Sequence, residues 1–228
     1  MRIQKFLSQQ RIASRREAER LIQQGLVRVN GKVAQIGAQI NPAKDKVEIA
    51  GQPKENNQKI TVAFNKPRDI VCSKIESEGK TIFQLLPQFS HLNAVGRLDK
   101  DSEGLILLSN DGVITAAVTS EKHLIEKEYQ VRVREEISQW HMKQMEAGIK
   151  LEDGLTLPAK AKLLDKHDFS LIIKEGRKHQ IRRMCAALNL TVERLKRIRI
   201  GNIGLGGLKA GDYRILNAKE IAALKSTA

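Results

Sequence analysis

The chain has 228 residues, of which 41% are hydrophobic and 29% charged, a composition typical of a folded protein. Forty lysines and arginines against 26 acidic residues give a net charge of +14, so a polyanion is the expected partner. No stretch approaches the ~18 apolar residues of a membrane span, and the N-terminus lacks the apolar core of a signal peptide. The two cysteines, Cys72 and Cys185, fit neither a disulfide framework nor a zinc pattern. We therefore expect a cytoplasmic protein without a metal and without a membrane partner.

Residues 1–50 have the pattern of a small domain of their own. Two short helices are predicted, over residues 3–10 and 15–24, and the second follows a capping box formed by Ser14 and Glu17. Two short strands then flank Asn30-Gly31, a strong hairpin signal. The expected result is a pair of helices beside a small β ribbon.

This N-terminal segment is itself basic. From residue 1 to residue 48, ten cations and four anions give a charge of +6. Arg15, Arg16 and Arg20 lie at or near the start of the second helix, where backbone N–H groups and the helix dipole favour phosphate. A solvated helix face is the alternative interpretation. The clustering favours RNA binding, so these three arginines are candidate RNA-binding residues.

A polar segment, residues 51–58, is expected to link this domain to a larger α+β domain over residues 59–225. The strands and the helix expected in the larger domain alternate with polar turns. They are strands at residues 60–64, 94–98, 104–109, 128–133 and 170–173 and a helix at residues 178–188.

The densest polar stretch lies between two apolar strands and contains Arg97 and Asp99. Polar side chains held between buried strands are well placed to form a site. Asp99, Asp101 and Glu103 also imitate the start of a calcium loop, but the twelfth position of such a loop would be Asn110 instead of a glutamate. An acidic turn that merely caps two strands is the structural alternative.

Two further stretches can contribute to a site. Tyr129 shares a strand face with Val131 and Val133, so its ring is expected to point inward, either as core or as the wall of a base-binding pocket. In the expected helix at 178–188, Lys178, His179 and Arg182 are cations in the first turns, where they oppose the dipole. Cations at positions that are unfavourable for the helix suggest a functional site or a bound anion.

The C-terminal part of the larger domain adds one more basic segment. Four cations occur in its strand-like run, two of them alternating with apolar residues, which predicts a strand that presents charge to phosphates. They are Arg194, Lys196, Arg197 and Arg199. Cys185 falls on the apolar side of the preceding helix and is expected in the core.

These motifs resemble known families. The segments R-I-Q-K-F-L, S-R-R-E-A and V-N-G-K resemble the S4-type RNA-binding domain. The segments G-R-L-D-K-D-S-E-G-L-I-L-L-S-N-D-G, E-K-E-Y-Q-V and E-G-R-K-H-Q-I-R-R-M resemble bacterial ribosomal RNA pseudouridine synthases. The match is to the subfamily that carries an S4 domain, which includes small-subunit synthases and large-subunit synthases of the B and F type, and it resembles the F type most.

The resemblance implies a role for each matching residue. Asp99 corresponds to the catalytic carboxylate, Tyr129 to the residue that stacks on the target uracil, and Arg182 to the partner of the carboxylate. The resemblance also places further residues around the site or against RNA. They are Arg97, Arg177, Lys178, His179 and Arg183. It implies a mainly antiparallel sheet with a central cleft.

The implied function is site-specific isomerisation of uridine to pseudouridine in ribosomal RNA, with 23S RNA favoured. The same chemistry on 16S or transfer RNA is an alternative, and a non-enzymatic S4-domain ribosome-assembly factor is another. The implied enzyme needs no cofactor or metal. We expect a monomer that acts on ribosomal RNA or on a pre-ribosomal particle.

Overall fold

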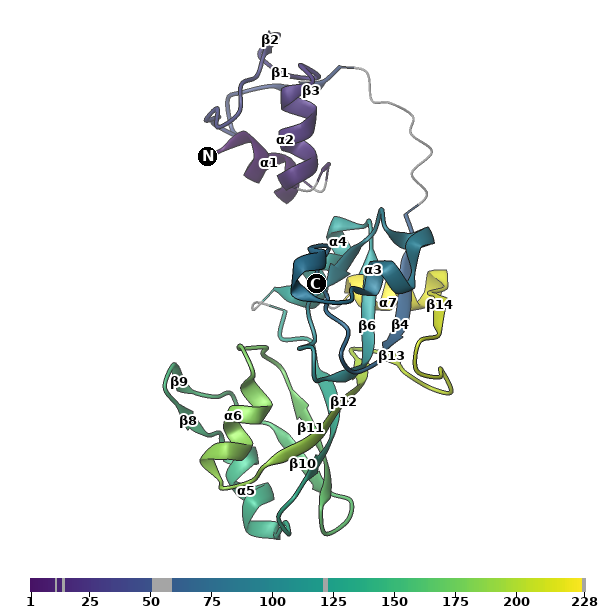
Figure 1. The fold of residues 1–228 in the computed structure, drawn as a ribbon. Helices are drawn as coiled ribbons and strands as arrows, with labels where there is room; N and C mark the ends of the chain where they lie inside the picture. Colours follow the sequence, from purple (N-terminus) through teal and green to yellow (C-terminus); the bar gives the residue numbers. More distant parts are fainter. Residues whose placement is uncertain (11, 14, 51–58, 121–122, 227–228) are drawn as a thin grey trace. The chain divides into compact units, whose positions relative to one another are not determined.

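The computed structural model describes residues 1–228 except 11, 14, 51–58, 121–122 and 227–228, and the side chains of Gln9, Arg16 and Glu76 also stay undescribed. The chain divides into two compact units, Met1–Lys59 and Ile60–Ala228 (Figure 1). The expected linker at 51–58 and Ser14 of the expected capping box lie outside the described residues.

The first unit pairs two helices with a three-stranded antiparallel sheet. The elements are α1 (Ile3–Gln9), α2 (Arg15–Gln23), β1 (Val27–Val29), β2 (Lys32–Val33) and β3 (Val47–Ile49), with the strands in the order β2-β1-β3. Asn30 and Gly31 both have positive φ, 51° and 80°, as a type I′ hairpin turn requires. Ile3, Leu7 and Ala18 are fully buried between the helices and the sheet, so the unit has a core of its own.

The second unit is built on one long, mixed sheet. Its strands are β4 (Thr61–Lys66), β5 (Asn93–Val95), β6 (Glu103–Ser109), β7 (Lys127–Val133), β10 (Lys160–Leu163), β11 (Asp168–Ile173), β12 (Val192–Ile200), β13 (Ile203–Gly204) and β14 (Tyr213–Ile215). A separate hairpin joins β8 (Lys150–Leu151) to β9 (Gly154–Leu155). The helices are α3 (Ile82–Leu85), α4 (Gly112–Thr119), α5 (Gln139–Ala147), α6 (Gln180–Ala187) and α7 (Ala218–Ser226), and the 3₁₀ turns are η1 (Glu76–Glu78) and η2 (Pro87–Phe89).

The sheet runs in the order β10-β11-β7-β12-β6-β4-β14, with β5 on β6 and β13 on β12. Throughout the described part of this sheet, neighbouring strands are antiparallel except for β12 beside β6. The expected α+β class with a mainly antiparallel sheet is therefore confirmed. Figure 1 shows β12 running through the middle of this unit, with α5 and α6 at one end and α4 and α7 at the other.

Both faces of β6 are buried, which explains its uninterrupted run of apolar residues. Leu105 and Leu107 face one apolar cluster, with α4 and α7. Ile106 and Leu108 face a second cluster, which includes residues of α3, α5 and α6. The central strands are thus fixed from both sides, and side chains at their ends are held in place.

One cross-strand row passes through the centre of the sheet. In register order it contains Leu171 on β11, Tyr129 on β7, Arg197 on β12, Gly104 on β6 and Lys66 on β4. Three of the five are polar or charged residues in an otherwise apolar sheet, which marks the row as a functional candidate.

Two expected boundaries differ from the structure because of local backbone conformation. The helix expected from residue 178 begins at Gln180, because His179 adopts a left-handed conformation with φ of 50°. The strand expected to reach residue 98 ends at Val95, because Gly96 turns the chain at φ of 73°. Both corrections place the flanking polar residues in loops. Among the helices described, none is long and apolar enough to cross a membrane.

Candidate active site

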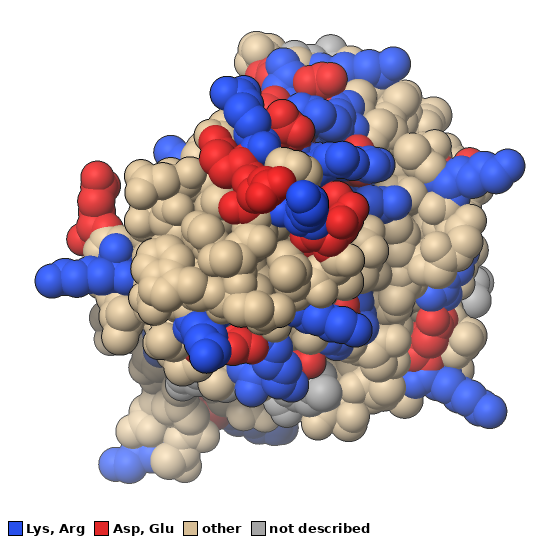
Figure 2. All heavy atoms as spheres, turned by 90° about the horizontal axis from the view of Figure 1, so that it is seen from below, with Lys and Arg blue, Asp and Glu red and all other residues tan. Residues whose placement is uncertain are grey.

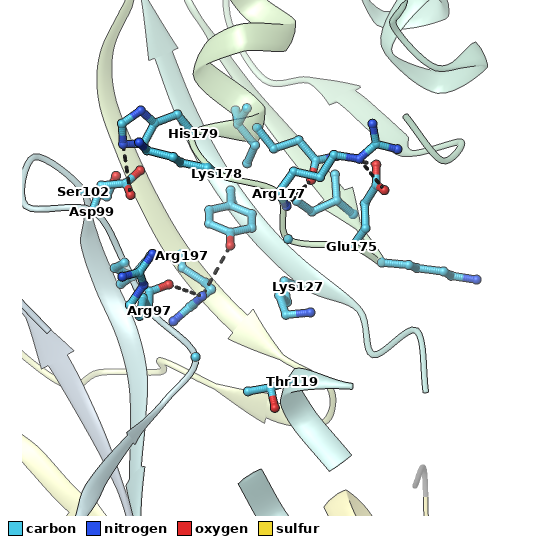
Figure 3. A pocket seen from close by; sticks show the side chains of 18 of the residues that line it. Arg97, Asp99, Ser102, Thr119, Lys127, Glu175, Arg177, Lys178, His179 and Arg197 are labelled. Carbon is cyan, nitrogen blue, oxygen red and sulfur yellow. Dashed lines mark hydrogen bonds and ion pairs between the residues drawn. The ribbon is translucent and has the colours of Figure 1, made fainter. Parts of the chain in front are cut away.

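A cleft of about 650 Å³ opens at the centre of the second unit (Figure 3). Its walls come from the loop after β5, from β7 and β12, and from the turn before α6. The volume falls in the range of small-ligand pockets and would hold a nucleoside.

The loop that carries Asp99 is held from behind by a buried lysine. Lys66 is fully buried, and its Nζ donates hydrogen bonds to the carbonyl oxygens of Ile70 at 2.8 Å and Lys100 at 3.3 Å. Burial lowers the pKa of Lys66. Cys72 adds a second tie, since its Sγ accepts from the backbone N–H of Leu98 and donates to the Leu98 carbonyl. The carboxylate is therefore presented from a supported loop.

Asp99 lies opposite His179 across one side of the cleft. The two side chains face each other, with His179 Nε2 3.4 Å from Asp99 Oδ1 (Figure 3). Both are accessible, 39% for Asp99 and 50% for His179, so a ligand can reach the carboxylate.

The expected ion pair between Arg182 and Asp99 is not formed in the structure. The Arg182 guanidinium instead donates to the carbonyl oxygens of Asp101 at 3.4 Å and Val192 at 3.3 Å. Because α6 begins at Gln180, Arg182 lies in the first turn of this helix. Its guanidinium reaches the backbone of the loop that carries Asp99. Arg182 thus supports that loop.

Tyr129 forms one wall of the cleft, as the expected inward orientation requires. Its side chain is buried, at 8% exposure, and its hydroxyl accepts a 3.4 Å hydrogen bond from Nη1 of Arg197. The Arg197 guanidinium lies 5.9 Å from the centroid of the tyrosine ring. The ring is therefore fixed and available for stacking.

Sequence reasoning missed the position of Arg197. We expected it to present charge to phosphates from a surface strand, but its side chain is 3% exposed and lines the cleft. The alternation along β12 is interrupted by a bulge between Arg197 and Arg199, which no sequence pattern announced. Its place opposite Tyr129 in the sheet register is the feature that identifies it.

Lys127 is a second cleft residue that sequence reasoning did not single out. Its Nζ has one hydrogen bond, 3.3 Å to the Ile125 carbonyl. Burial, and next the charge of Arg197, lower the pKa of Lys127 to about 8. Its place in the E-K-E-Y motif, two residues before Tyr129, was the available signal.

Arg177 and Arg183, expected to bind RNA, are engaged within the protein. Arg183 makes two 2.9 Å hydrogen bonds to the carboxylate of Asp153, and this contact holds the pKa of Asp153 at about 2. Arg177 donates to Glu175 at 3.0 Å and to the carbonyl oxygen of Leu155 at 2.6 Å. Both arginines clamp the β8–β9 hairpin onto the cleft. Their predicted contacts with RNA stay predictions, since these hydrogen bonds show only how the two side chains are held within the protein.

The other expected RNA-binding residues are accessible. Arg97 and Lys178 are exposed and line the cleft (Figure 3). In the first unit, Arg15 is exposed, and Arg20 forms a 2.8 Å ion pair with Glu17. The side chain of Arg16 lies outside the described part of the chain.

The net positive charge does not form one uniform surface. Figure 2 shows a face on which basic side chains stand beside acidic ones. Exposed ion pairs such as Lys166–Glu136 at 3.2 Å and Arg132–Asp168 at 3.8 Å reduce the local potential. Cations that line the cleft without such partners are therefore the more specific anion-binding candidates.

The site combines an accessible carboxylate, a fixed aromatic ring and several cations in one cleft. A carboxylate can act as nucleophile or base, the ring can hold a flat base by stacking, and the cations can attract the negative charge of a nucleotide. Among the described residues, no three histidine, cysteine, aspartate or glutamate side chains gather as a metal site, and Glu103 of the calcium-like segment is held by Arg194 at 2.6 Å.

Comparison with protein families gives two matches. Residues 60–187 match the family model described as RNA pseudouridylate synthase, and residues 1–47 match the S4 domain. Together the two matches cover most of the chain, and the first contains the cleft residues Asp99 and Tyr129 and the loop-supporting Arg182.

Three relatives match nearly the whole chain. Ribosomal large subunit pseudouridine synthase B of Bacillus subtilis is 37% identical over 100% of this chain and 96% of its own length. Dual-specificity RNA pseudouridine synthase RluF of Escherichia coli K12 is 37% identical, with 98% of this chain and 78% of its own length covered. Ribosomal small subunit pseudouridine synthase A of Pasteurella multocida is 37% identical, with 97% and 98% covered.

A solved structure agrees with these matches. A crystal structure of a pseudouridylate synthase superposes with a TM-score of 0.74 and 35% identity, and it covers 98% of this chain and 99% of its own. The similarity extends over both compact units of the chain and is not confined to the cleft.

Proposed function

Because the chain belongs to the RNA pseudouridylate synthase family, we propose that it converts one or more specific uridines of ribosomal RNA to pseudouridine, with the target in the 23S RNA of the large subunit. The observation that carries the proposal is the cleft itself, where the accessible Asp99 carboxylate lies near the fixed ring of Tyr129.

The reaction exchanges one bond for another within the same nucleotide. The bond from C1′ to N1 breaks, the uracil turns, and C1′ bonds to C5, whose proton is then lost while N1 gains one. Reactant and product contain the same atoms, so the chemistry consumes no second substrate. The target uridine must leave its base stack to enter the cleft, which costs a few kcal/mol, and contacts between cations and phosphates offset part of this cost.

The residues in and beside the cleft have separate roles in this reaction. Asp99 acts on the ribose, as nucleophile at C1′ or as a base toward the sugar. Tyr129 holds the uracil by stacking while it turns. Arg182 keeps the Asp99 loop in position through the Asp101 carbonyl, and Arg97, Lys178 and His179 bind the RNA around the cleft entrance.

The large-subunit assignment is supported by the Bacillus subtilis relative, which the chain matches from end to end. The small-subunit relative is equally similar, so 16S RNA is the direct alternative, and transfer RNA is a further one. A ribosome-assembly factor without activity would have no use for an accessible carboxylate in a cation-lined cleft. We further propose that the protein acts as a cytoplasmic monomer on free ribosomal RNA or on a pre-ribosomal particle.

Pseudouridine mapping of total RNA from cells with and without the gene tests the substrate. We expect one or more pseudouridines to disappear from 23S RNA, and to return when the wild-type gene is restored. Loss of a pseudouridine from 16S or transfer RNA instead would contradict the 23S assignment but would still support the conversion of uridine to pseudouridine. Unchanged pseudouridine in all three RNAs would favour the assembly-factor alternative.

Replacing Asp99 by asparagine tests the chemistry. Asp99→Asn keeps the side-chain shape and removes the charge, so turnover should fall by about 10²–10⁴-fold or more while RNA binding is retained. Tritium release from RNA labelled at C5 of uridine measures turnover, and filter binding measures affinity. Asp69→Asn, which removes a carboxylate of no assigned role from the same unit, is the control. Turnover of Asp99→Asn at the wild-type rate would refute the assignment.

A further inference from the structure

Arg197 has an unusual environment for an arginine. It is 3% exposed, and its Nε donates to the Leu105 carbonyl at 2.7 Å. Nη1 makes two longer contacts, 3.4 Å each, to the Arg97 carbonyl and to the Tyr129 hydroxyl. Nη2 is buried and has no hydrogen-bond partner. A buried donor without a partner is rare and costly, so its retention calls for an explanation.

The charge of Arg197 is also uncompensated. Most arginines of β12 pair with carboxylates: Arg194 with Glu103, and Arg199 with Glu126 and Glu128. Across the described residues, no carboxylate lies within ion-pair distance of Arg197, and the second cation Lys127 lines the same cleft. A buried cation without a counter-ion is unfavourable by itself and becomes favourable when a negative charge enters.

The position of Arg197 is fixed relative to the ring that holds the base. It pairs with Tyr129 in the register of β12 and β7, and its guanidinium lies beside the ring (Figure 3). A base stacked on Tyr129 would bring its polar edge to the unpartnered Nη2. Asp99, which acts on the sugar, lies on the side of the cleft where it faces His179.

We propose that Arg197 is a catalytic residue that stabilises the uracil as it leaves the ribose. When the bond from C1′ to N1 breaks, the electron pair stays on N1, and the negative charge spreads over N1 and the two carbonyl oxygens. Nη2 donates to one of these oxygens. The charge disappears again when C5 bonds to C1′; the C5 proton then departs to a base, and N1 takes up a proton, so that the neutral product forms. This inference rests on the proposed pseudouridine synthase function and assigns a new residue to it.

The guanidinium suits this task for two reasons. It carries N–H donors and no acceptor, so it always offers a donor to the substrate. It is also held in place before the substrate arrives, so little rearrangement is needed as the charge develops, and its effect is larger in a water-poor cleft than in solution.

The test compares two RNAs that differ in the stability of the leaving group. Large-subunit ribosomal RNA is transcribed with uridine or with 5-fluorouridine, whose fluorine withdraws electrons and stabilises the detached base. Consumption of the target nucleotide is followed by mass spectrometry of nuclease digests, in single turnover with saturating enzyme. Wild type, Arg197→Met and Arg197→Lys are compared, with Arg132→Met as the control that removes an equal charge from the neighbouring strand β7.

On uridine RNA, Arg197→Met should react about 10²–10³-fold more slowly than wild type, the usual effect of losing one donor to a developing anion. On 5-fluorouridine RNA the loss should shrink by at least about tenfold. The rate of Arg197→Lys should fall between those of wild type and Arg197→Met, and methylguanidinium should restore part of the Arg197→Met rate. Arg132→Met should remain within about threefold of wild type on both RNAs.

Two outcomes would overturn the inference. An equal loss of rate on both RNAs would show that Arg197 does not stabilise the leaving uracil. A loss that vanishes at saturation would make it an RNA-binding residue only. If Arg197→Met fails to fold by circular dichroism, Arg197→Lys carries the same comparison, and an equal loss there has the same meaning. Failure of wild type to convert uridine RNA at all would refute the proposed function itself.

Discussion

Arginines in and around the cleft perform different tasks that their spacing in the sequence does not reveal. Arg183 is bound by Asp153 and secures a hairpin, Arg182 holds the backbone of the Asp99 loop, and Arg197 is buried beside Tyr129. All three stand in basic segments, so sequence reasoning treated them alike as partners of RNA or of the carboxylate. Partner identity depends on contacts across the sheet and is visible only in the fold.

Replacing Arg182 by methionine separates the two roles considered for it. If Arg182 supports the loop through the Asp101 and Val192 carbonyls, Arg182→Met loses two charged hydrogen bonds and destabilises the protein by about 1–3 kcal/mol. The single-turnover rate should then fall at every pH without a change in the shape of the pH profile. Thermal unfolding and a pH–rate series measure both effects.

The alternative role of Arg182, as the direct partner of Asp99, predicts a different pH profile. Direct pairing with Asp99, as expected from the sequence, predicts that the rate of Arg182→Met recovers as pH rises and the carboxylate ionises again. Such recovery would contradict the loop-support role. Arg132→Met, which removes an exposed arginine paired with Asp168 at 3.8 Å, is the control for loss of positive charge.

At the scale of elements, the sequence predicted the strands well where one physical cause dominated. The apolar run of β6 and the alternation of β7 both match the structure, because burial on two faces or on one face sets the pattern directly. The start of α6 was wrong by two residues, since the left-handed backbone of His179 is not encoded in periodicity. The β12 bulge was equally invisible in the sequence, and the burial of Arg197 beside Tyr129 depends on the pairing of β12 with β7.

Gly104 lets β6 approach β12 at the point where Arg197 is held. Its φ is 102°, and a Cβ added there would collide with the carbonyl oxygen of Arg197 and lie 2.8 Å from the Arg197 backbone nitrogen. Both partners are backbone atoms of a central strand, so they cannot move aside without disturbing the sheet. Gly104, the last residue of the segment G-R-L-D-K-D-S-E-G, is thus required by close strand packing.

Gly104→Ala should therefore destabilise the protein by about 2–5 kcal/mol, from backbone strain and overpacking together. Denaturant unfolding followed by circular dichroism measures the change. Gly207→Ala is the matched control, because an added Cβ there meets no atom within 4 Å and its backbone is not left-handed. Equal stability of the two variants would show that β6 and β12 can separate without cost.

For the whole molecule, charge is shared between the two units in a way that suggests a division of labour. Residues 1–48 hold +6 of the total +14, although they form about a fifth of the chain. The cleft with Asp99 and Tyr129 belongs entirely to the second unit, which has its own core and sheet. The first unit is therefore expected to add affinity and register on the RNA, and the second to supply the chemistry.

Deleting residues 1–59 tests this division. The shortened protein should bind its natural RNA more weakly, and its affinity should depend less on salt, because each lost phosphate contact lowers the slope of log K against log salt by about 0.7–0.9. At saturating RNA, its single-turnover rate should stay within about tenfold of the full chain, since every cleft residue remains. Affinities measured between 50 and 300 mM salt give the slope, and Asp99→Asn in the full chain serves as the inactive, binding-competent control. An unchanged slope would mean that the first unit does not contact the phosphates, and a rate lost even at saturation would mean that it helps to assemble the cleft.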